Sequence, residues 1–358
     1  MTACLLCPGA LADPDPAIEA RLPAAASDAI ASTPLRCASL SEYRIDPDVL
    51  PRELPHEQWL RSRFGLPATA SVEAFGALGA TGLMPPAGAL VVRPVHLHVG
   101  LDHLVLLPPH ALSLSRSQAE ALVEAANRHL EPDGASLSCA GPDWWLLKGI
   151  RATEAVIRSS RVAAGRNVTA YLPEGPGARE LIRIVNELQM LWHDHPGNVE
   201  RERSGQLTVN GLWIEGIVDP PDTSSGLVRT VHADDPAIRG IALACAAATL
   251  EPAPQTPTEC LESLARPDSI IELPFWLKAS IDRDPARWRD GWRRFTDLLA
   301  PLRSRLARKV KRFDVVLTGE TEIAILSWSA TDRWKWWRRA DLVLEREVLA
   351  RPRPGLSR

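Results

Sequence analysis

The second half of the chain alternates helical segments with short apolar runs, and this alternation restricts the possible folds more than any other feature. Helical patterns cover residues 237–249 and 284–307, and the apolar runs 269–273 and 313–317 follow them in turn. Helices and strands that alternate in this way bury their apolar sides as layers, with helices packed on a sheet. The sequence therefore predicts an α/β fold, a layered sheet with helices on both faces.

A smaller lobe is expected before residue 205. The runs 90–92 and 103–107 flank a glycine-containing turn and predict paired strands. A helix capped by Ser117, with Glu120 three residues on, then leads to a predicted strand over 144–148. We expect a discontinuous α/β core, an inserted α+β lobe and a C-terminal tail, covering residues 1–88 with 205–340, 89–204 and 341–358 respectively.

An amphipathic helix is predicted over 178–192. Its apolar positions recur at spacings of three and four, as one buried stripe requires: Leu181, Ile184, Val185, Leu188 and Leu191. Pro196 then stops the helix, because proline lacks the amide donor and keeps the preceding residue out of helical space. His195 is therefore expected at the helix exit, with its ring free to point elsewhere.

Two further polar side chains follow this proline. Asn198 offers both a donor and an acceptor, and Arg201 presents a planar fork that suits a carboxylate or a phosphate. Together they predict a site for a small anion. The alternative is that His193 and His195 cap the helix and that Arg201 is a solvated charge.

The helix, the pattern His-Pro-x-Asn-x-x-Arg at 195–201, Gly205, Asn210 and Leu-Trp213 together resemble the signature of cofactor-independent, archaeal-type phosphoglycerate mutases of the alkaline-phosphatase superfamily. They resemble more closely the bacterial regulatory proteins of RpfE type, and the resemblance extends over most of the chain. Segment 91–98 is similar to the one that carries a substrate-facing arginine. The resemblance thus implies a phosphorylated small molecule as ligand, held by Arg93, His195, Asn198, Arg201 and Asn210.

The chain departs from the mutase pattern where the chemistry is done. The resemblance implies two metal ions of the Mn or Zn kind, held by Asp and His, and a serine nucleophile. Here Cys7-Pro8-Gly9 stands in place of the first Asp-Gly, segment 270–282 has no His, and no His follows His232. Ser71 can be aligned with the nucleophile but lacks the Asp that follows it.

Phosphoryl transfer through a serine depends on the positive charge that metal ions usually supply. We therefore expect no catalytic residue, no metal site and no cofactor, and a non-catalytic regulatory or anion-binding protein. The alternative is an active mutase-type isomerase that uses Mn²⁺. His96, His98 and His103 leave open a replacement metal site, since His96 and His98 share one face of a strand.

Cys4 and Cys7 have a spacing that also occurs in zinc and redox sites. We expect buried thiols at the end of a strand instead, because no further ligands are near and Pro8-Gly9 does not start a helix. Asp234 and Asp235 precede Pro236, which predicts the capped start of a helix rather than a metal site.

The net charge of −3 gives no overall attraction to nucleic acid, which we do not expect as a partner. No stretch reaches about 18 apolar residues, so the sequence predicts no membrane span and a cytoplasmic protein. The C-terminal third nevertheless mixes Arg and Lys with aromatic residues, including Trp288, Trp292, Phe295 and Trp334. Such a surface suits a protein partner. A second alternative is that it binds single-stranded nucleic acid. The third is that these residues have only a structural role.

Overall fold

The computed structural model describes residues 2–11, 24–44, 50–100, 103–150, 154–218, 228–247 and 249–332. The chain divides into two compact units. Unit 1 consists of Met1–Val49, Gly226–Asp234 and Ala247–Arg358, and unit 2 of Leu50–Ser225 and Asp235–Ala246. Each unit is built from segments that lie far apart in the sequence.

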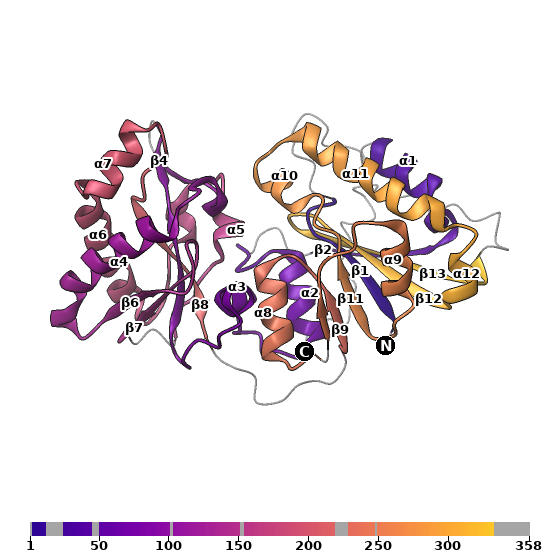
Figure 1. The fold of residues 1–358 in the computed structure, drawn as a ribbon, viewed down its shortest axis with the longest axis horizontal. Helices are drawn as coiled ribbons and strands as arrows, with labels where there is room; N and C mark the ends of the chain where they lie inside the picture. Colours follow the sequence, from indigo (N-terminus) through magenta and orange to yellow (C-terminus); the bar gives the residue numbers. More distant parts are fainter. Residues whose placement is uncertain are drawn as a thin grey trace. The chain divides into compact units, whose positions relative to one another are not determined.

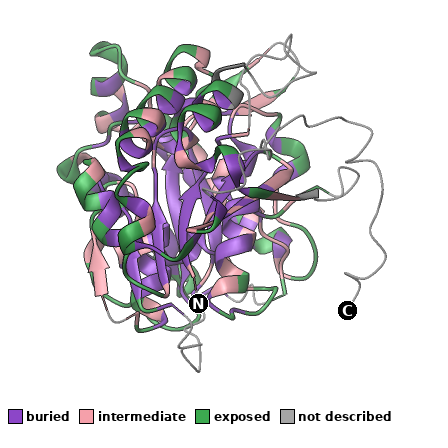
Figure 2. Ribbon diagram, turned by 90° about the vertical axis from the view of Figure 1, so that its right-hand side faces the viewer, coloured by how far each residue is buried: buried purple, intermediate pink, exposed green. Residues whose placement is uncertain are grey.

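Unit 1 contains a seven-stranded sheet in the order β10-β9-β11-β1-β12-β13-β2 (Figure 1). The first five strands in this order run parallel, whereas β13 is antiparallel to both of its neighbours. The strands are β1 Ala3–Cys7, β2 Ser39–Arg44, β9 Thr230–His232, β10 Thr249–Glu251, β11 Ser269–Glu272, β12 Arg312–Thr318 and β13 Glu322–Ser329. Strands β1 and β11 are buried along their whole length, as parallel strands usually are (Figure 2).

Helices of unit 1 share one apolar cluster with the sheet. They are α1 Ala24–Ser32, α9 Pro257–Leu264, α10 Leu277–Ile281, α11 Pro285–Leu299 and α12 Leu306–Lys309. The aromatic residues of α11 provide much of this core, because Trp288, Trp292 and Phe295 are almost completely buried. The predicted α/β layered sheet with flanking helices is thereby confirmed.

Unit 2 contains a four-stranded antiparallel sheet in the order β6-β7-β3-β8 and a separate pair, β4-β5. The strands are β3 Leu90–Val95, β4 Leu97–Val99, β5 Leu104–Leu106, β6 Ser136–Cys139, β7 Trp145–Lys148 and β8 Gly211–Ile217. Run 103–107 pairs with β4 rather than with 90–92, so that predicted pairing was wrong. Strand β3 pairs instead with β7 and β8, which lie far from it in sequence.

Two long helices, α4 (Arg116–Leu130) and α6 (Ala178–His193), share an apolar cluster with one face of this sheet. The predicted stripe of α6 is confirmed, with Leu181, Ile184 and Leu188 fully buried. Helix α4 is capped by Ser115, with Gln118 three residues on, so the cap lies two residues before the expected one at Ser117. The remaining helices of unit 2 are α2 Pro55–Arg63, α3 Gly76–Thr81, α5 Ser160–Ala163, α7 Pro196–Arg203 and α8 Pro236–Ala244.

Helices α3 and α8 approach each other through two glycines. A Cβ atom on Gly79 would lie 1.8 Å from the carbonyl oxygen of Pro236, and one on Gly240 would lie 1.8 Å from that of Phe75. No side chain fits at such distances, so both positions need glycine. This contact explains why 235–246 belongs to unit 2 although the preceding strand, β9, belongs to unit 1.

The unit boundaries differ from the expected ones. The lobe expected over 89–204 is part of a larger unit that begins at Leu50, because the elements over 55–81 pack within it and β8 completes its sheet. The tail at 341–358 lies outside the described residues. Among the described residues, no helix has both the length and the apolar character needed to cross a membrane.

Candidate functional site

Asn198 holds together the two ends of the segment that follows α6. Its side-chain nitrogen donates to the carbonyl oxygens of Trp192 and Val209, at 2.7 and 2.8 Å, and its oxygen accepts from the Val209 amide at 2.8 Å. The residue is 2% exposed. The side-chain amide of Asn198 is therefore occupied by hydrogen bonds to backbone groups.

Arg201 is equally enclosed, at 1% exposure. Its guanidinium donates from Nε to the Leu207 carbonyl at 2.7 Å, from Nη1 to Gln118 Oε1 at 2.9 Å, and from Nη2 to the Leu112 carbonyl. The arginine therefore connects the 201–207 turn to the start of α4 and the segment before it. Burial lowers the pKa of this guanidinium group.

His195 and Asn210 also contact backbone. His195 is the N-cap of α7, where its Nδ1 accepts the Gly197 amide at 3.1 Å. This cap starts a second helix that the sequence reasoning did not anticipate. Asn210 exchanges two hydrogen bonds with Leu97, accepting from its amide at 2.6 Å and donating to its carbonyl at 2.9 Å. Four residues of the signature therefore bind backbone groups near them and do not face a common site: His195, Asn198, Arg201 and Asn210.

Arg93, the fifth predicted residue, lies elsewhere, on β3, and is 9% exposed. Its guanidinium carbon is 4.4 Å from the centroid of the Trp144 ring, and its Nη1 is 4.0 Å from Glu73 Oε2. Glu73 belongs to a cluster of buried charges in unit 2, which we call the ionic cluster: His56, Glu57, Glu73, Arg93, Arg161, Glu215 and Asp235.

Arg161, on α5, is the centre of the ionic cluster. Its Nη1 lies 3.0 Å from Glu73 Oε1 and 3.7 Å from Glu57 Oε1, and its Nη2 lies 2.5 Å from Asp235 Oδ2. The three carboxylates come from α2, from the short helix η3 (Glu73–Phe75) and from the N-cap of α8. The N-cap role of Asp235 was predicted and is confirmed, since its Oδ1 accepts the amides of Ala237 and Ile238.

Glu215 enters the ionic cluster through an irregularity in β8. The register pairs Val92 with Ile214 and Val91 with Gly216, so Glu215 is the extra residue of a β-bulge. Bulges redirect side chains in this way. Glu215 Oε2 accepts the Ser160 amide at 2.9 Å, next to Arg161. Ser71, the residue aligned with the mutase nucleophile, donates to the Glu215 carbonyl at 2.8 Å.

Four carboxyl groups accompany only two guanidinium groups in the ionic cluster, and the pKa values reflect this imbalance. Burial, reinforced by Glu73, raises the pKa of Glu57 well above its ordinary value. Burial also raises the pKa of Glu73 to about 7, against the opposing effect of Arg161, and it raises the pKa of Glu215. Burial opposes ionisation of Asp235 too, but Arg161 and His56 bring its pKa below the ordinary value. Asp235 is therefore the ionised partner of Arg161.

His56 is the neutral member of the ionic cluster. Burial and the charge of Arg161 lower its pKa to about 3, and neither ring nitrogen has a hydrogen-bond partner. Oxygens of Glu57, Glu73 and Glu215 are likewise buried without a hydrogen bond. Strongly perturbed groups of this kind concentrate at functional sites but also occur in structural ion networks.

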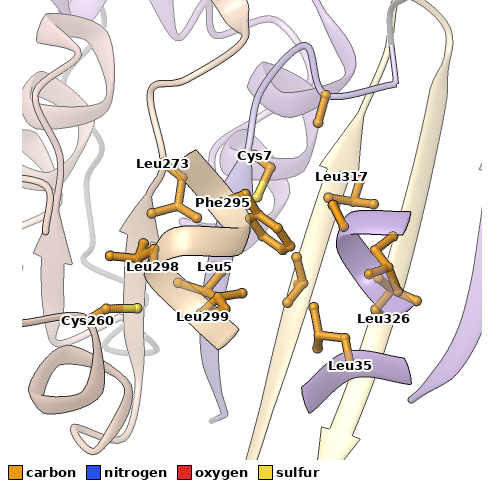
Figure 3. Close-up of a cluster of buried hydrophobic side chains, with 14 of the residues drawn as sticks. Leu5, Cys7, Leu35, Cys260, Leu273, Phe295, Leu298, Leu299, Leu317 and Leu326 are labelled. Atoms are coloured by element: carbon orange, nitrogen blue, oxygen red, sulfur yellow. The ribbon is translucent and has the colours of Figure 1, made fainter. Parts of the chain in front are cut away.

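The carboxyl edge of the unit 1 sheet is where the resemblance places metal ligands. Cys7 ends β1 with its side chain in the apolar cluster that contains Phe295 and Leu317 (Figure 3). It shares this face with Leu5, as the two-residue period of a strand requires. Burial raises the pKa of its thiol well above the ordinary value, so a metal-binding thiolate is disfavoured. Cys4 is also buried, which confirms the expectation of strand-end thiols.

The neighbouring strands end in residues that bind each other. Glu272, the last residue of β11, accepts the Asp234 amide at 2.9 Å, and Asp234 accepts the Ala253 amide at 3.1 Å. His232 Nδ1 lies 3.3 Å from Glu251 Oε2. Within the described ranges, no group of three or more His, Cys, Asp or Glu side chains has a geometry that could hold a metal ion, including the region of His96, His98 and His103.

Comparisons with known proteins bear mainly on the fold. The PH0037 protein from Pyrococcus horikoshii has a TM-score of 0.50 at 13% identity, over 92% of this chain and 87% of that one. A cofactor-independent phosphoglycerate mutase from Thermoplasma acidophilum has a TM-score of 0.41 at 13% identity, over 92% and 90%. At this identity such likenesses concern the fold alone.

One curated protein matches part of the sequence. The probable 2,3-bisphosphoglycerate-independent phosphoglycerate mutase of Geobacter sulfurreducens is 31% identical over 83 residues, which are 22% of this chain. The matched segment spans about a fifth (21%) of that relative's length. No family model matches the chain.

Sequence reasoning found one member of the ionic cluster as a site residue, Arg93, and Asp235 as a helix cap. The other five members, His56, Glu57, Glu73, Arg161 and Glu215, were missed, because they come from four separate places in the sequence and no motif connects them. A possible signal was the single Glu215 within the apolar strand 211–217, since a buried carboxylate needs a partner.

The basic C-terminal third divides into two parts. On α11, the aromatic residues are core, whereas arginines such as Arg287, Arg289 and Arg293 are exposed to solvent. Arg294 covers the Phe275 ring at 4.3 Å. This arrangement leaves no aromatic surface for stacking bases on α11. Trp334, Trp336 and Trp337 lie outside the described residues.

Proposed function

We propose that the chain is a non-catalytic, phosphoglycerate-mutase-like regulatory protein, of the RpfE type that its signature resembles. Its place would be the bacterial cytoplasm. The mutase-like character is supported by the 83-residue match to a probable phosphoglycerate mutase. The regulatory role is inferred from the residues at the carboxyl edge of the unit 1 sheet, where the resemblance places metal ligands.

The observation that carries this proposal is the burial of Cys7. A mutase-type centre needs an ionised oxygen ligand at the end of β1, whereas this chain has a protonated thiol inside the apolar cluster. Glu272, the last residue of β11, uses one of its oxygens to accept the Asp234 amide. Ser71 is part of unit 2, where it binds the Glu215 carbonyl.

A phosphorylated small molecule remains the proposed ligand, but the described contacts change which residue should be tested first. Asn198, Arg201 and Asn210 already bind backbone groups. Arg93 is the predicted residue whose guanidinium has the weakest protein contacts, at 3.3 Å to the Asp143 carbonyl and 4.0 Å to Glu73. A phosphate bound by Arg93 would add negative charge beside Glu73 and would therefore favour the protonated form of that carboxyl group.

The test is an assay of 3- and 2-phosphoglycerate interconversion with and without Mn²⁺, together with calorimetric titration of Mn²⁺ and of 3-phosphoglycerate. We expect no turnover and no stoichiometric Mn²⁺ binding. Binding of 3-phosphoglycerate should be independent of metal and should be lost in Arg93→Gln but kept in Arg128→Gln, which removes an exposed arginine. Turnover that requires Mn²⁺ would overturn the proposal and favour the active isomerase.

A protein partner for the basic, Trp-rich C-terminal region is proposed on sequence alone. Removal of residues 333–358 is expected to abolish such an interaction and to leave the described fold unchanged. Circular dichroism of the shortened chain checks the second part of this expectation.

A further inference from the structure

A pocket of about 140 Å³ opens in unit 2 beside α6. Its wall is mainly aliphatic and aromatic, and its lining includes Ile157, Tyr171, Leu172, Ile182, Val185 and Trp213. Two of its lining residues, Ile182 and Val185, lie on α6 and are half-buried. None of the residues of the ionic cluster lines it.

Arg158 is the only charged side chain among the described residues that line this pocket. It is 8% exposed, and its Nε is buried without a hydrogen-bond partner. The two terminal nitrogens reach the Leu172 carbonyl at 3.4 Å and Glu174 Oε2 at 3.2 Å. A buried guanidinium with an unused donor and long contacts is incompletely paired, which costs free energy that a better acceptor would recover.

Glu174 pairs with Arg158 on the solvent side of the pocket. This carboxylate is 61% exposed, so the end of Arg158 that meets it lies close to solvent. The backbone of Glu174 is fixed independently of its side chain, by two hydrogen bonds with Val156 of 2.8 and 3.1 Å. A carboxylate from a ligand can therefore replace that of Glu174 without a change in the backbone.

Size and chemistry together define the ligand. A cavity of about 150 Å³ accommodates benzene, so the present pocket takes about one six-membered ring or a branched alkyl group of similar size. Pockets of this type are apolar with a few polar groups that fix orientation, and arginine binds carboxylate through two parallel hydrogen bonds. We propose that this pocket binds a small carboxylic acid with one compact apolar group, its carboxylate on Arg158 in exchange for Glu174.

This ligand class differs from phosphoglycerate, which has no apolar group to fill the pocket. The two proposals therefore fail independently. Excess 3-phosphoglycerate should leave occupancy of the pocket unchanged, and Arg93→Gln should leave it unchanged as well.

The experiment is a calorimetric titration of the full chain with phenylacetate and with phenylacetamide, its neutral isostere. We expect phenylacetate to bind at least about tenfold more tightly than phenylacetamide, because only the carboxylate pairs with Arg158. Ile182→Trp, which enlarges a lining side chain, should abolish binding. No binding of phenylacetate by the wild-type chain, or binding that Ile182→Trp leaves unchanged, would overturn the proposal.

A second variant avoids any risk that changes at the pocket wall disturb folding. Glu174→Gln changes only an exposed side chain and removes the competing carboxylate, so it should strengthen phenylacetate binding by several-fold. Glu180→Gln is the matched control, since it removes one exposed carboxylate from the start of α6 without touching Arg158. Equal affinities in the two variants would contradict the exchange with Glu174.

Discussion

Arg161 and Asp235 form an ion pair of 2.5 Å between residues 74 positions apart in the sequence. Arg161 lies on α5, and Asp235 caps α8, the helix that follows strand β9 of unit 1. The pair therefore ties the returning segment 235–246 to the rest of unit 2. Because both side chains are about nine-tenths buried, water does little to screen this interaction.

Arg161→Met should be among the most destabilising single substitutions in unit 2. It keeps most of the side-chain volume but leaves Asp235 buried without its cation, and removal of one partner of a buried pair costs about 3–5 kcal/mol. The measurement is the urea dependence of the unfolding transition of unit 2. Arg128→Met is the control, because the pair of Arg128 with Glu124 is exposed and worth at most about 1 kcal/mol. Similar losses in both variants would refute the central role of Arg161.

Glu73→Gln should change how stability depends on pH. The folded state raises the pKa of Glu73 from 4.5 to about 7, so it binds the proton more tightly than the unfolded chain does. The resulting stability is complete below about pH 4.5 and is lost as the pH rises through 7, at about 1.4 kcal/mol per pKa unit. Between pH 4.5 and 8, the free energy of unfolding of the wild type should therefore fall relative to that of Glu73→Gln.

The difference between the two proteins is the quantity to follow, because His56 acts in the opposite sense. Its pKa is lowered to about 3, so its contribution is present above pH 6.5 and declines on acidification. That contribution is common to wild type and Glu73→Gln to a first approximation. A difference that stays constant with pH would show that Glu73 does not titrate in this range.

Gly240→Ala should separate α3 from α8. The added Cβ would lie 1.8 Å from the Phe75 carbonyl oxygen, so the helices must move apart, and overpacking of this kind costs about 1–3 kcal/mol or more. Amide hydrogen exchange in α3 and α8 should accelerate. Gly141→Ala is the control, since a Cβ there meets nothing within 4 Å. Unchanged exchange in α8 would contradict the close approach.

Asn198→Ala tests whether the His-Pro-x-Asn-x-x-Arg pattern has a structural role. The variant loses three hydrogen bonds to buried backbone groups, and each unsatisfied group costs about 1–3 kcal/mol. Its melting temperature should fall by more than that of Asn186→Ala, which changes an exposed residue of α6. A stable variant that has lost only the binding of an anion would instead support the ligand role predicted from the sequence.

The layered fold and the helix over 178–192 were predictable because their signals are local. Apolar spacing identifies α6 to within a residue, and the proline after two aspartates identifies the start of α8. Strand pairing was harder to predict. Strand β3 pairs with β8, more than 100 positions away, and the residue pattern within β3 does not indicate which strand is its partner. The division into units was missed for the same reason, since it depends on contacts such as that between Gly79 and Pro236.

The candidate site illustrates a related difficulty. His195, Asn198 and Arg201 have the residue types of an anion site and lie close together in sequence, yet their polar groups contact nearby backbone. The sequence shows which side chains can donate hydrogen bonds to an anion, but it does not show which backbone carbonyl groups occupy those donors in the fold. Conversely, the ionic cluster gathers residues from 56 to 235, and each looks unremarkable where it stands.

The division of the chain also constrains the order of its biosynthesis. Unit 2 needs helix α8, so its packing cannot be completed until residue 246 has left the ribosome, although its first residue is Leu50. Strand β1 must wait longer for its neighbour β12, which is made about 300 residues later. Buried strand surface of β1 is therefore exposed during most of translation, a period in which unpaired apolar strands are prone to aggregate. We therefore expect chaperones to bind the β1 segment while the rest of unit 1 is still being made.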